Sequence, residues 1–133
     1  MLIFDNNLSF EFTDFKDSKF KKIYLVSNKN ENRSIKLNEK VSIFKYLLFE
    51  DQEKRLKDQS IDCEIIDISQ IKKIDEKNIG LYPTVGENLD YLNLNNLKIN
   101  FLYRKLDQYS WQYCNKGFFN FKNYIPKIIS NFT

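Results

Sequence analysis

Residues 37–57, LNEKVSIFKYLLFEDQEKRLK, contain the clearest helix pattern in the chain. The apolar residues recur at the spacing of one helical face, with two neighbours that widen the stripe: Leu37, Val41, Phe44 and Leu48, then Ile43 and Leu47. Asn38 is a residue type that caps helices, and Glu39 follows it in the first turn, where the helix dipole favours an anion. The pattern predicts a long helix from Asn38 to about Lys57.

Stretches rich in β-branched and aromatic residues flank this helix on both sides. Residues 20–27 (FKKIYLVS) precede it, and residues 61–68 (IDCEIIDI), which alternate apolar and acidic side chains, follow it. Residues 2–12 predict a further strand, or a hairpin that turns at Asn6 and Asn7. Residues 97–103 predict another strand, so the sequence indicates a sheet of about four to five strands.

The remaining segments indicate shorter helices and one long loop. We expect a short helix over 69–77 and a loop over 80–96, because that stretch contains Gly80, Pro83 and Gly86. A helix over 104–115 would stop at Gly117, and a last helix would be capped by Asn123. The irregular order of strands and helices predicts an α+β fold. It would be a small mixed or antiparallel sheet packed against one long central helix and two C-terminal helices, in a single domain over 1–133.

The composition disfavours most catalytic chemistry. The chain has 133 residues and no His, which excludes His-based catalytic dyads and triads and the commonest zinc sites. None of its three glycines belongs to a phosphate-binding fingerprint. We therefore predict no catalytic residue, no metal site and no cofactor, and we favour a protein that is not an enzyme. Ala is absent and Asn is abundant, which indicates an AT-biased gene, and we attribute the Asn-rich stretches to that bias.

Acidic residues in the strand of residues 61–68 are the remaining candidates for chemistry. Asp62 and Glu64 share a face, and such a pair can bind a divalent cation or divide acid and base roles. The interpretation we favour is the polar face of a half-buried strand. Cys63 and Cys114 are far apart in the sequence and are predicted to be free, buried thiols in a reducing compartment. The first residues do not resemble a signal peptide and no stretch is apolar enough to cross a membrane, so we expect a cytoplasmic protein.

Basic and aromatic residues gather in the last third of the chain. The net charge is +3, and residues 98–132 contain ten of the twenty-one aromatic residues. The candidate binding residues there combine large rings and cations: Arg104, Lys105, Tyr109, Trp111, Tyr113 and Lys116. Such residues suit packing, a protein interface or single-stranded nucleic acid. A second candidate patch is acidic and follows the apolar part of the long helix: Glu50, Asp51 and Glu53.

No motif is specific enough to indicate a family. The absence of catalytic motifs and the surplus of aromatic residues favour a dedicated protein-binding module. We expect an immunity-type or antitoxin-type inhibitor that blocks a cognate toxin. The alternative is a His-independent ribonuclease or RNA-binding protein that uses the basic, aromatic C-terminal third. A structural subunit that self-associates is a third possibility, and we expect a monomer or a small homo-oligomer without a membrane partner.

Overall fold

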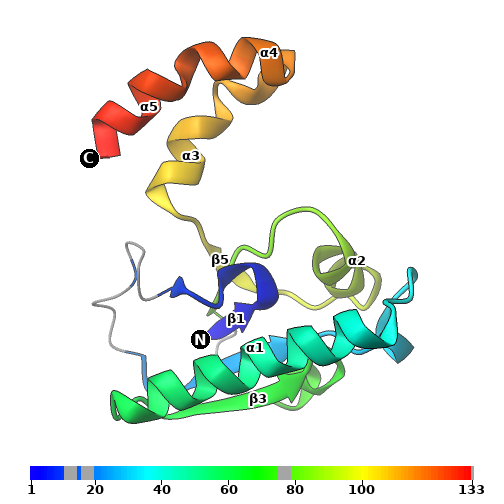
Figure 1. The fold of residues 1–133 in the computed structure, drawn as a ribbon. Helices are drawn as coiled ribbons and strands as arrows, with labels where there is room; N and C mark the ends of the chain where they lie inside the picture. The colour runs from blue at the N-terminus through cyan, green and yellow to red at the C-terminus, as the bar shows by residue number, and fades with distance from the viewer. Residues whose placement is uncertain (11–14, 16–19, 75–78, 133) are drawn as a thin grey trace. The chain divides into compact units, whose positions relative to one another are not determined.

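The computed structural model describes residues 1–10, 15, 20–74 and 79–132 (Figure 1). The chain divides into two compact units, Met1–Leu102 and Tyr103–Thr133, which are described separately. The prediction of a single domain remains a prediction.

The first unit is built on a five-stranded sheet with the order β3-β2-β1-β4-β5. Its strands are short: β1 (Leu2–Phe4), β2 (Ile23–Ser27), β3 (Cys63–Asp67), β4 (Ile79–Leu81) and β5 (Asn100–Leu102). Every neighbouring pair is parallel. The predicted α+β fold with a mixed or antiparallel sheet is therefore wrong, and the unit has an α/β fold.

The strands of this parallel sheet are buried on both faces, because the crossover connections that join parallel strands place helices on the faces of a sheet. All three residues of β1 are buried, and strands covered on both sides appear in a sequence as continuous apolar runs. The predicted hairpin at Asn6 and Asn7 is not formed within the described residues, because Asp5–Asn7 form a 3-10 turn and β1 pairs in parallel with β2. Residues 11 and 12, the end of the predicted strand over 2–12, lie outside the described residues.

Helices cover the sheet on both sides. The long helix α1 (Glu39–Asp58) packs its buried Phe49 and Leu56 against one face. That face carries alternate residues of the strands: Ile3, Ile23, Leu25 and Cys63. The 3-10 segment η4 (Ile68–Lys73) and α2 (Glu87–Leu94) contribute Ile68, Ile71 and Leu92 to the other core. The strand residues there are the intervening ones: Leu2, Phe4, Val26 and Ile66.

The prediction of the long helix is confirmed together with its cap. Asn38 has an extended backbone and its side chain accepts a hydrogen bond from the Lys40 amide at 2.9 Å. The predicted loop over 80–96 is wrong, because it contains the end of β4 and the whole of α2. Gly80 lies in β4, and Gly86 is the residue that precedes α2 with φ of 138°. Such a backbone suits glycine, so Gly86 marks the start of a helix rather than the middle of a loop.

The second unit consists of short helices. These are α3 (Lys105–Trp111), α4 (Phe118–Phe121) and α5 (Ile125–Phe132), joined by the 3-10 turns η5 (Cys114–Lys116) and η6 (Lys122–Tyr124). Asn123 lies inside η6, so the last helix starts one residue later than a cap at Asn123 would place it. Aromatic rings hold the unit together: Tyr113 and Tyr124 stack with ring centroids 4.5 Å apart.

The structure also tests the predictions for the two cysteines and for membrane-spanning segments. Both cysteines are free, but only Cys63 is buried; Cys114 is exposed, so the prediction of a buried thiol is wrong there. Across the described residues, no helix combines the length and the apolar character needed to cross a membrane.

Candidate functional site

Strand β1 lies in the middle of the sheet, and the strands that follow it in the chain are added first on one side of it and then on the other. The chain places β2 and β3 on one side of β1, and β4 and β5 on the other. In open α/β sheets ligands bind outside the carboxyl ends of the strands at such a switch point. Asp5 follows β1 there, and Asn7 donates from Nδ2 to the carbonyl oxygen of Tyr82, which follows β4, at 3.0 Å.

A pocket of about 440 Å³ lies at this edge, between α1 and the carboxyl ends of β1, β2 and β3. We call it the edge pocket. Its polar lining includes Asp5, Asn28, Lys45 and Asp67, and its apolar lining includes Leu37, Tyr46, Phe49 and Ile65. The volume is within the range of small-molecule sites, which are mostly apolar with a few placed polar groups.

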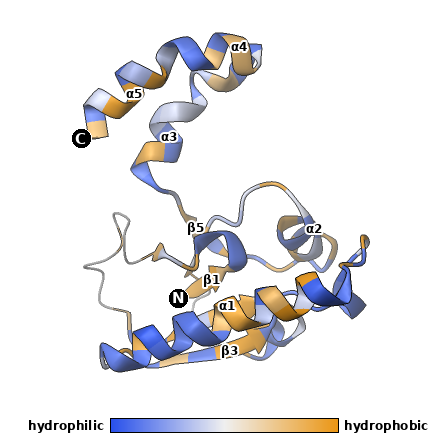
Figure 2. Ribbon diagram, viewed as in Figure 1, coloured by the Kyte–Doolittle hydropathy of each residue, from blue (hydrophilic) through white to orange (hydrophobic). Residues whose placement is uncertain are grey.

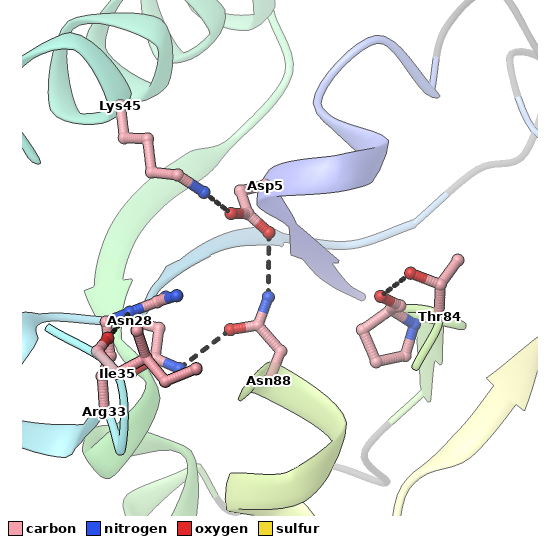
Figure 3. Close-up of polar contacts among 8 residues, drawn as sticks. Asp5, Asn28, Arg33, Ile35, Lys45, Thr84 and Asn88 are labelled. Atoms are coloured by element: carbon pink, nitrogen blue, oxygen red, sulfur yellow. Dashed lines mark hydrogen bonds and ion pairs between the residues drawn. The ribbon is translucent and has the colours of Figure 1, made fainter. Parts of the chain in front are cut away.

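Four polar side chains from four segments form one hydrogen-bonded chain across this edge (Figure 3). Lys45 of α1 is paired with the Asp5 carboxylate after β1. Asn88 at the start of α2 donates from Nδ2 to Asp5 Oδ1 at 2.8 Å. Asn28, after β2, donates from its own Nδ2 to Asn88 Oδ1 at 3.0 Å. The chain therefore links the two halves of the sheet across the switch point.

The carboxylate fixes the direction of every bond in this chain. An ionised carboxylate only accepts hydrogen bonds, so Asn88 must present its NH₂ group to Asp5 and its oxygen to Asn28. Asn28 then donates with its NH₂ group, and its Oδ1 faces elsewhere. Among the described residues, Asn28 Oδ1 is buried without a hydrogen-bond partner. An unsatisfied buried acceptor destabilises the folded state by about 1–3 kcal/mol.

Asp67 supplies a second carboxylate to the edge pocket, at the end of β3. Its Oδ2 accepts from Asn32 Nδ2 at 2.8 Å and from the Ser69 amide at 3.0 Å. Burial alone would raise the pKa of Asp67, but the hydrogen bonds from Ser69, from Asn32 and from the Lys29 amide outweigh it, and the pKa is lowered. Asp67 is therefore a structural anion that holds the loop after β2 against the end of β3.

Asparagine and glutamate side chains also fix the loop over 28–38. Asn30 Nδ2 donates to the Leu37 carbonyl at 2.9 Å, and Asn30 Oδ1 accepts from the Leu37 amide at 2.8 Å. Glu87 of α2 accepts from the amides of Ser34 and Ile35, both at 3.0 Å, and these bonds lower its pKa. The asparagines attributed above to codon bias thus make specific contacts. For Asn28, the signal in the sequence was its position directly after the predicted strand over 20–27.

The predicted acidic residues lie on α1 but outside the edge pocket. Asp51 pairs with Arg55 at 3.3 Å, and Glu53 pairs with Lys57 at 2.9 Å. Glu50 is exposed, and its charge, together with a hydrogen bond to it, raises the pKa of Tyr46. These three carboxylates do not share a contact. Each interacts with a different residue of α1.

The predicted basic and aromatic residues lie in the second unit. Arg104 precedes α3 and forms a bidentate pair with Asp107 at 2.6 and 3.0 Å, so its charge is already compensated. Tyr109 and Tyr113 are brought together, with ring centroids 5.7 Å apart. The Trp111 ring contacts Tyr103 instead, with ring centroids 5.6 Å apart. Lys105 opens α3 and Lys116 closes η5, both exposed.

Ionisation of the tyrosine pair depends on a nearby lysine. Lys127 lies over the Tyr113 ring at 5.5 Å. A hydrogen bond with Tyr109 and another with Lys127 lower the pKa of Tyr113, while the bond with Tyr113 raises the pKa of Tyr109. The hydrogen bond between Lys127 and Tyr113 also raises the pKa of Lys127. These three residues are a packed cluster within the unit.

The most exposed rings of this unit, among the described residues, were not among the predicted binding residues. Phe118 and Phe119 are 67% and 79% exposed, and Lys122 lies over the Phe119 ring at 5.7 Å. The signal was the pair of adjacent phenylalanines directly after Gly117, since neighbouring helix positions cannot both face one core contact.

The strand carboxylates considered for metal binding are separate from this site. Glu64 pairs with Lys22 at 2.8 Å on the sheet, and the described residues hold no group of three or more potential ligands suited to a metal ion. Comparisons with protein-family models, with curated proteins and with solved structures return no match for this chain.

Proposed function

We propose that the first unit binds a small, uncharged organic molecule in the edge pocket. The observation that carries this proposal is the position of the pocket, at the carboxyl ends of three parallel strands beside the switch point of the sheet. The proposed function is therefore ligand binding, and it assigns no reaction to the pocket.

The charges in the pocket support an uncharged ligand. Asp5 is paired with Lys45, and Asp67 is satisfied by amide and side-chain donors. A charged ligand would have to displace one of these partners or remain uncompensated in a partly buried site. The start of α2 is also unsuited to an anion such as phosphate, because Glu87 and Asp90 lie in its first turn.

The lining supports a ligand with a ring and hydrogen-bond donors. Leu37, Phe49 and Ile65 provide an apolar wall. Asp5, Asn28, Lys45 and Asp67 provide the polar lining, where N–H and O–H groups of a ligand can be placed. Nucleosides combine a planar ring, several donors and no charge, so they are suitable probes of this chemistry.

A thermal-shift and calorimetric titration with adenosine, guanosine, uridine and the free bases tests the proposal. A ligand at about 100 times its Kd stabilises the folded state by about 2.7 kcal/mol, which is an easily measured shift in Tm. The variant Asn28→Leu replaces a polar residue of the lining by an apolar one and is expected to lose at least ~10-fold in affinity.

The matched control is Asn93→Leu on α2, an exposed residue outside the edge pocket, which is expected to bind like the wild type. The proposal is wrong if neither these probes nor a broader set of uncharged ring compounds binds. It is equally wrong if every compound that binds does so with the same affinity in wild type and Asn28→Leu.

A protein-binding role, of the immunity or antitoxin type, is the second candidate. It is favoured by the exposure of Phe118 and Phe119 beside Lys122, since exposed rings next to cations are typical of interface anchors. Affinity purification with a nuclease-treated control tests it. A stoichiometric protein partner should be lost in the double variant Phe118→Ser, Phe119→Ser and kept in Leu94→Ser, which removes an exposed apolar residue of the first unit. Recovery of RNA alone, lost with nuclease, would favour the alternative role instead.

A further inference from the structure

The helix α1 has a second apolar face that the described residues of the first unit leave exposed. Phe49, Gln52 and Leu56 are buried against the sheet. Another arc of the helix is exposed, with Phe44 at 60%, Leu47 at 55% and Ile43 at 53%. Figure 2 shows hydrophobic residues continuing along the middle of α1. Contiguous apolar surface of this kind marks an interaction site.

The residues along this face follow a coiled-coil spacing. Steps of four, three and four residues join the four positions of the seam within the helix: Lys40, Phe44, Leu47 and Asp51. The seam is apolar at its centre, basic at its N-terminal end and acidic at its C-terminal end. Lys40 precedes Phe44 by as many residues as Asp51 follows Leu47, so the pattern is symmetric about its centre with opposite charges at the two ends.

We propose that this face binds a second copy of the chain, with the two α1 helices antiparallel. A two-fold axis between Phe44 and Leu47 places Phe44 against Leu47 of the partner subunit. The same axis places Lys40 against Asp51 of the partner subunit, and it does so twice. Asp51 also pairs with Arg55 of its own helix at 3.3 Å, but its side chain is 67% exposed and such a surface pair is weak, so its carboxylate can accept the lysine as well. Val41, on the flank, then lies near Leu48 of the partner subunit; both are 42% exposed in one chain. A parallel pair would instead set lysine against lysine and aspartate against aspartate.

The two-fold pairing leaves the edge pocket accessible to a ligand by the geometry of the helix. Ser42, Lys45 and Phe49, which line the pocket, lie on the flank of α1 that faces the sheet. Self-association and ligand binding are thus separate properties, and each has its own measurement.

Sedimentation equilibrium of the full chain over a wide range of concentrations tests the proposal. We expect a reversible monomer–dimer equilibrium. Lys40→Glu and Asp51→Lys each convert two attractive contacts into repulsive ones, so each is expected to weaken the dimer about 10-fold. The double variant, which exchanges the two charges, is expected to restore the wild-type dissociation constant. Lys98→Glu, an exposed position outside α1 with the same change of charge, should leave it unchanged.

Rescue by the exchange is specific to contacts between subunits. Lys40 and Asp51 are about 16 Å apart along one helix, at 1.5 Å of rise per residue, so they do not form a pair within a chain. For the same reason, a zero-length carbodiimide cross-link between them can arise only between two chains. We expect that cross-link in the wild type, and this measurement needs no variant to fold.

A wild type that remains monomeric at every concentration overturns the proposal. A dimer that the exchanged double variant fails to restore, or that lacks the cross-link between Lys40 and Asp51, also overturns it.

Discussion

At the scale of single residues, carboxylates with many donors organise the carboxyl edge of the sheet. Asp67 is 7% exposed and binds the loop after β2 through Asn32 and the Lys29 amide. Asp5 performs a similar task for α1 and α2 through Lys45 and Asn88. Both carboxylates accept hydrogen bonds from donors that would otherwise lack a partner. Replacing either carboxylate is therefore expected to lower the free energy of unfolding.

Asp67→Asn is expected to destabilise the first unit by about 2 kcal/mol at neutral pH, the scale of hydrogen bonds to a charged group. Because the folded pKa of Asp67 is lowered, its contribution is present above the unfolded pKa and lost as the pH falls through the folded value. The variant should therefore lose less stability than the wild type on acidification. Urea unfolding at pH 7 and pH 3 measures both effects.

Glu64→Gln is the matched control, because the Glu64 side chain is 53% exposed and its pair with Lys22 lies at the surface. It is expected to change stability by less than about 1 kcal/mol. An acid dependence of Asp67→Asn identical to that of the wild type would contradict the structural role assigned to this carboxylate.

At the scale of elements, the sequence predicted the helices and strands that depend on local residue patterns. The helix over 39–58 was predicted with its Asn38 cap, because helical spacing and the cap are local features. Its packed face was predicted wrongly: the apolar stripe through Phe44 and Leu47 is exposed, and the residues buried in the fold are Phe49, Gln52 and Leu56. Four of the five strands fall within predicted strands. Their parallel pairing was missed, because it depends on which strands become neighbours through crossover connections, and only the tertiary structure shows this.

The same reason explains the missed elements near the site. Gly80 and Gly86 were interpreted as loop residues, yet one lies in β4 and the other starts α2. A Cβ on Gly80 would lie 3.2 Å from both Ile99 Cγ2 and Leu2 Cβ, so glycine there permits close packing of the sheet. The edge pocket was not predicted, since its residues come from strands whose order the sequence did not reveal.

Gly86→Ala is expected to destabilise the first unit by about 1–3 kcal/mol, because φ of 138° is strained for any residue with a Cβ. No neighbouring atom lies within 4 Å of the added Cβ, so the loss would report backbone strain rather than a clash. Asn96→Gly is the complementary control: Asn96 has φ of 52°, which glycine adopts freely. A Tm of Gly86→Ala equal to that of the wild type would contradict this account of how α2 begins.

At the scale of the whole molecule, the two units carry different surfaces. The first presents a pocket at the edge of a parallel sheet and an uncovered face of α1. The second is small, rich in exposed aromatic residues, and has most of its predicted binding residues engaged in contacts of its own. We therefore assign ligand binding to the first unit and keep a protein partner as the candidate role of the second.

The central claim is that the edge pocket is a ligand site, and a two-dimensional ¹H–¹⁵N NMR titration tests it most directly. The probes are the uncharged nucleosides and bases that give a thermal shift, added to the labelled full chain. The account predicts saturable changes at Asn28, Lys45 and Asp67, all of which line the pocket. Changes confined to residues 103–132, or no saturable change at the pocket with any compound that binds, would contradict it.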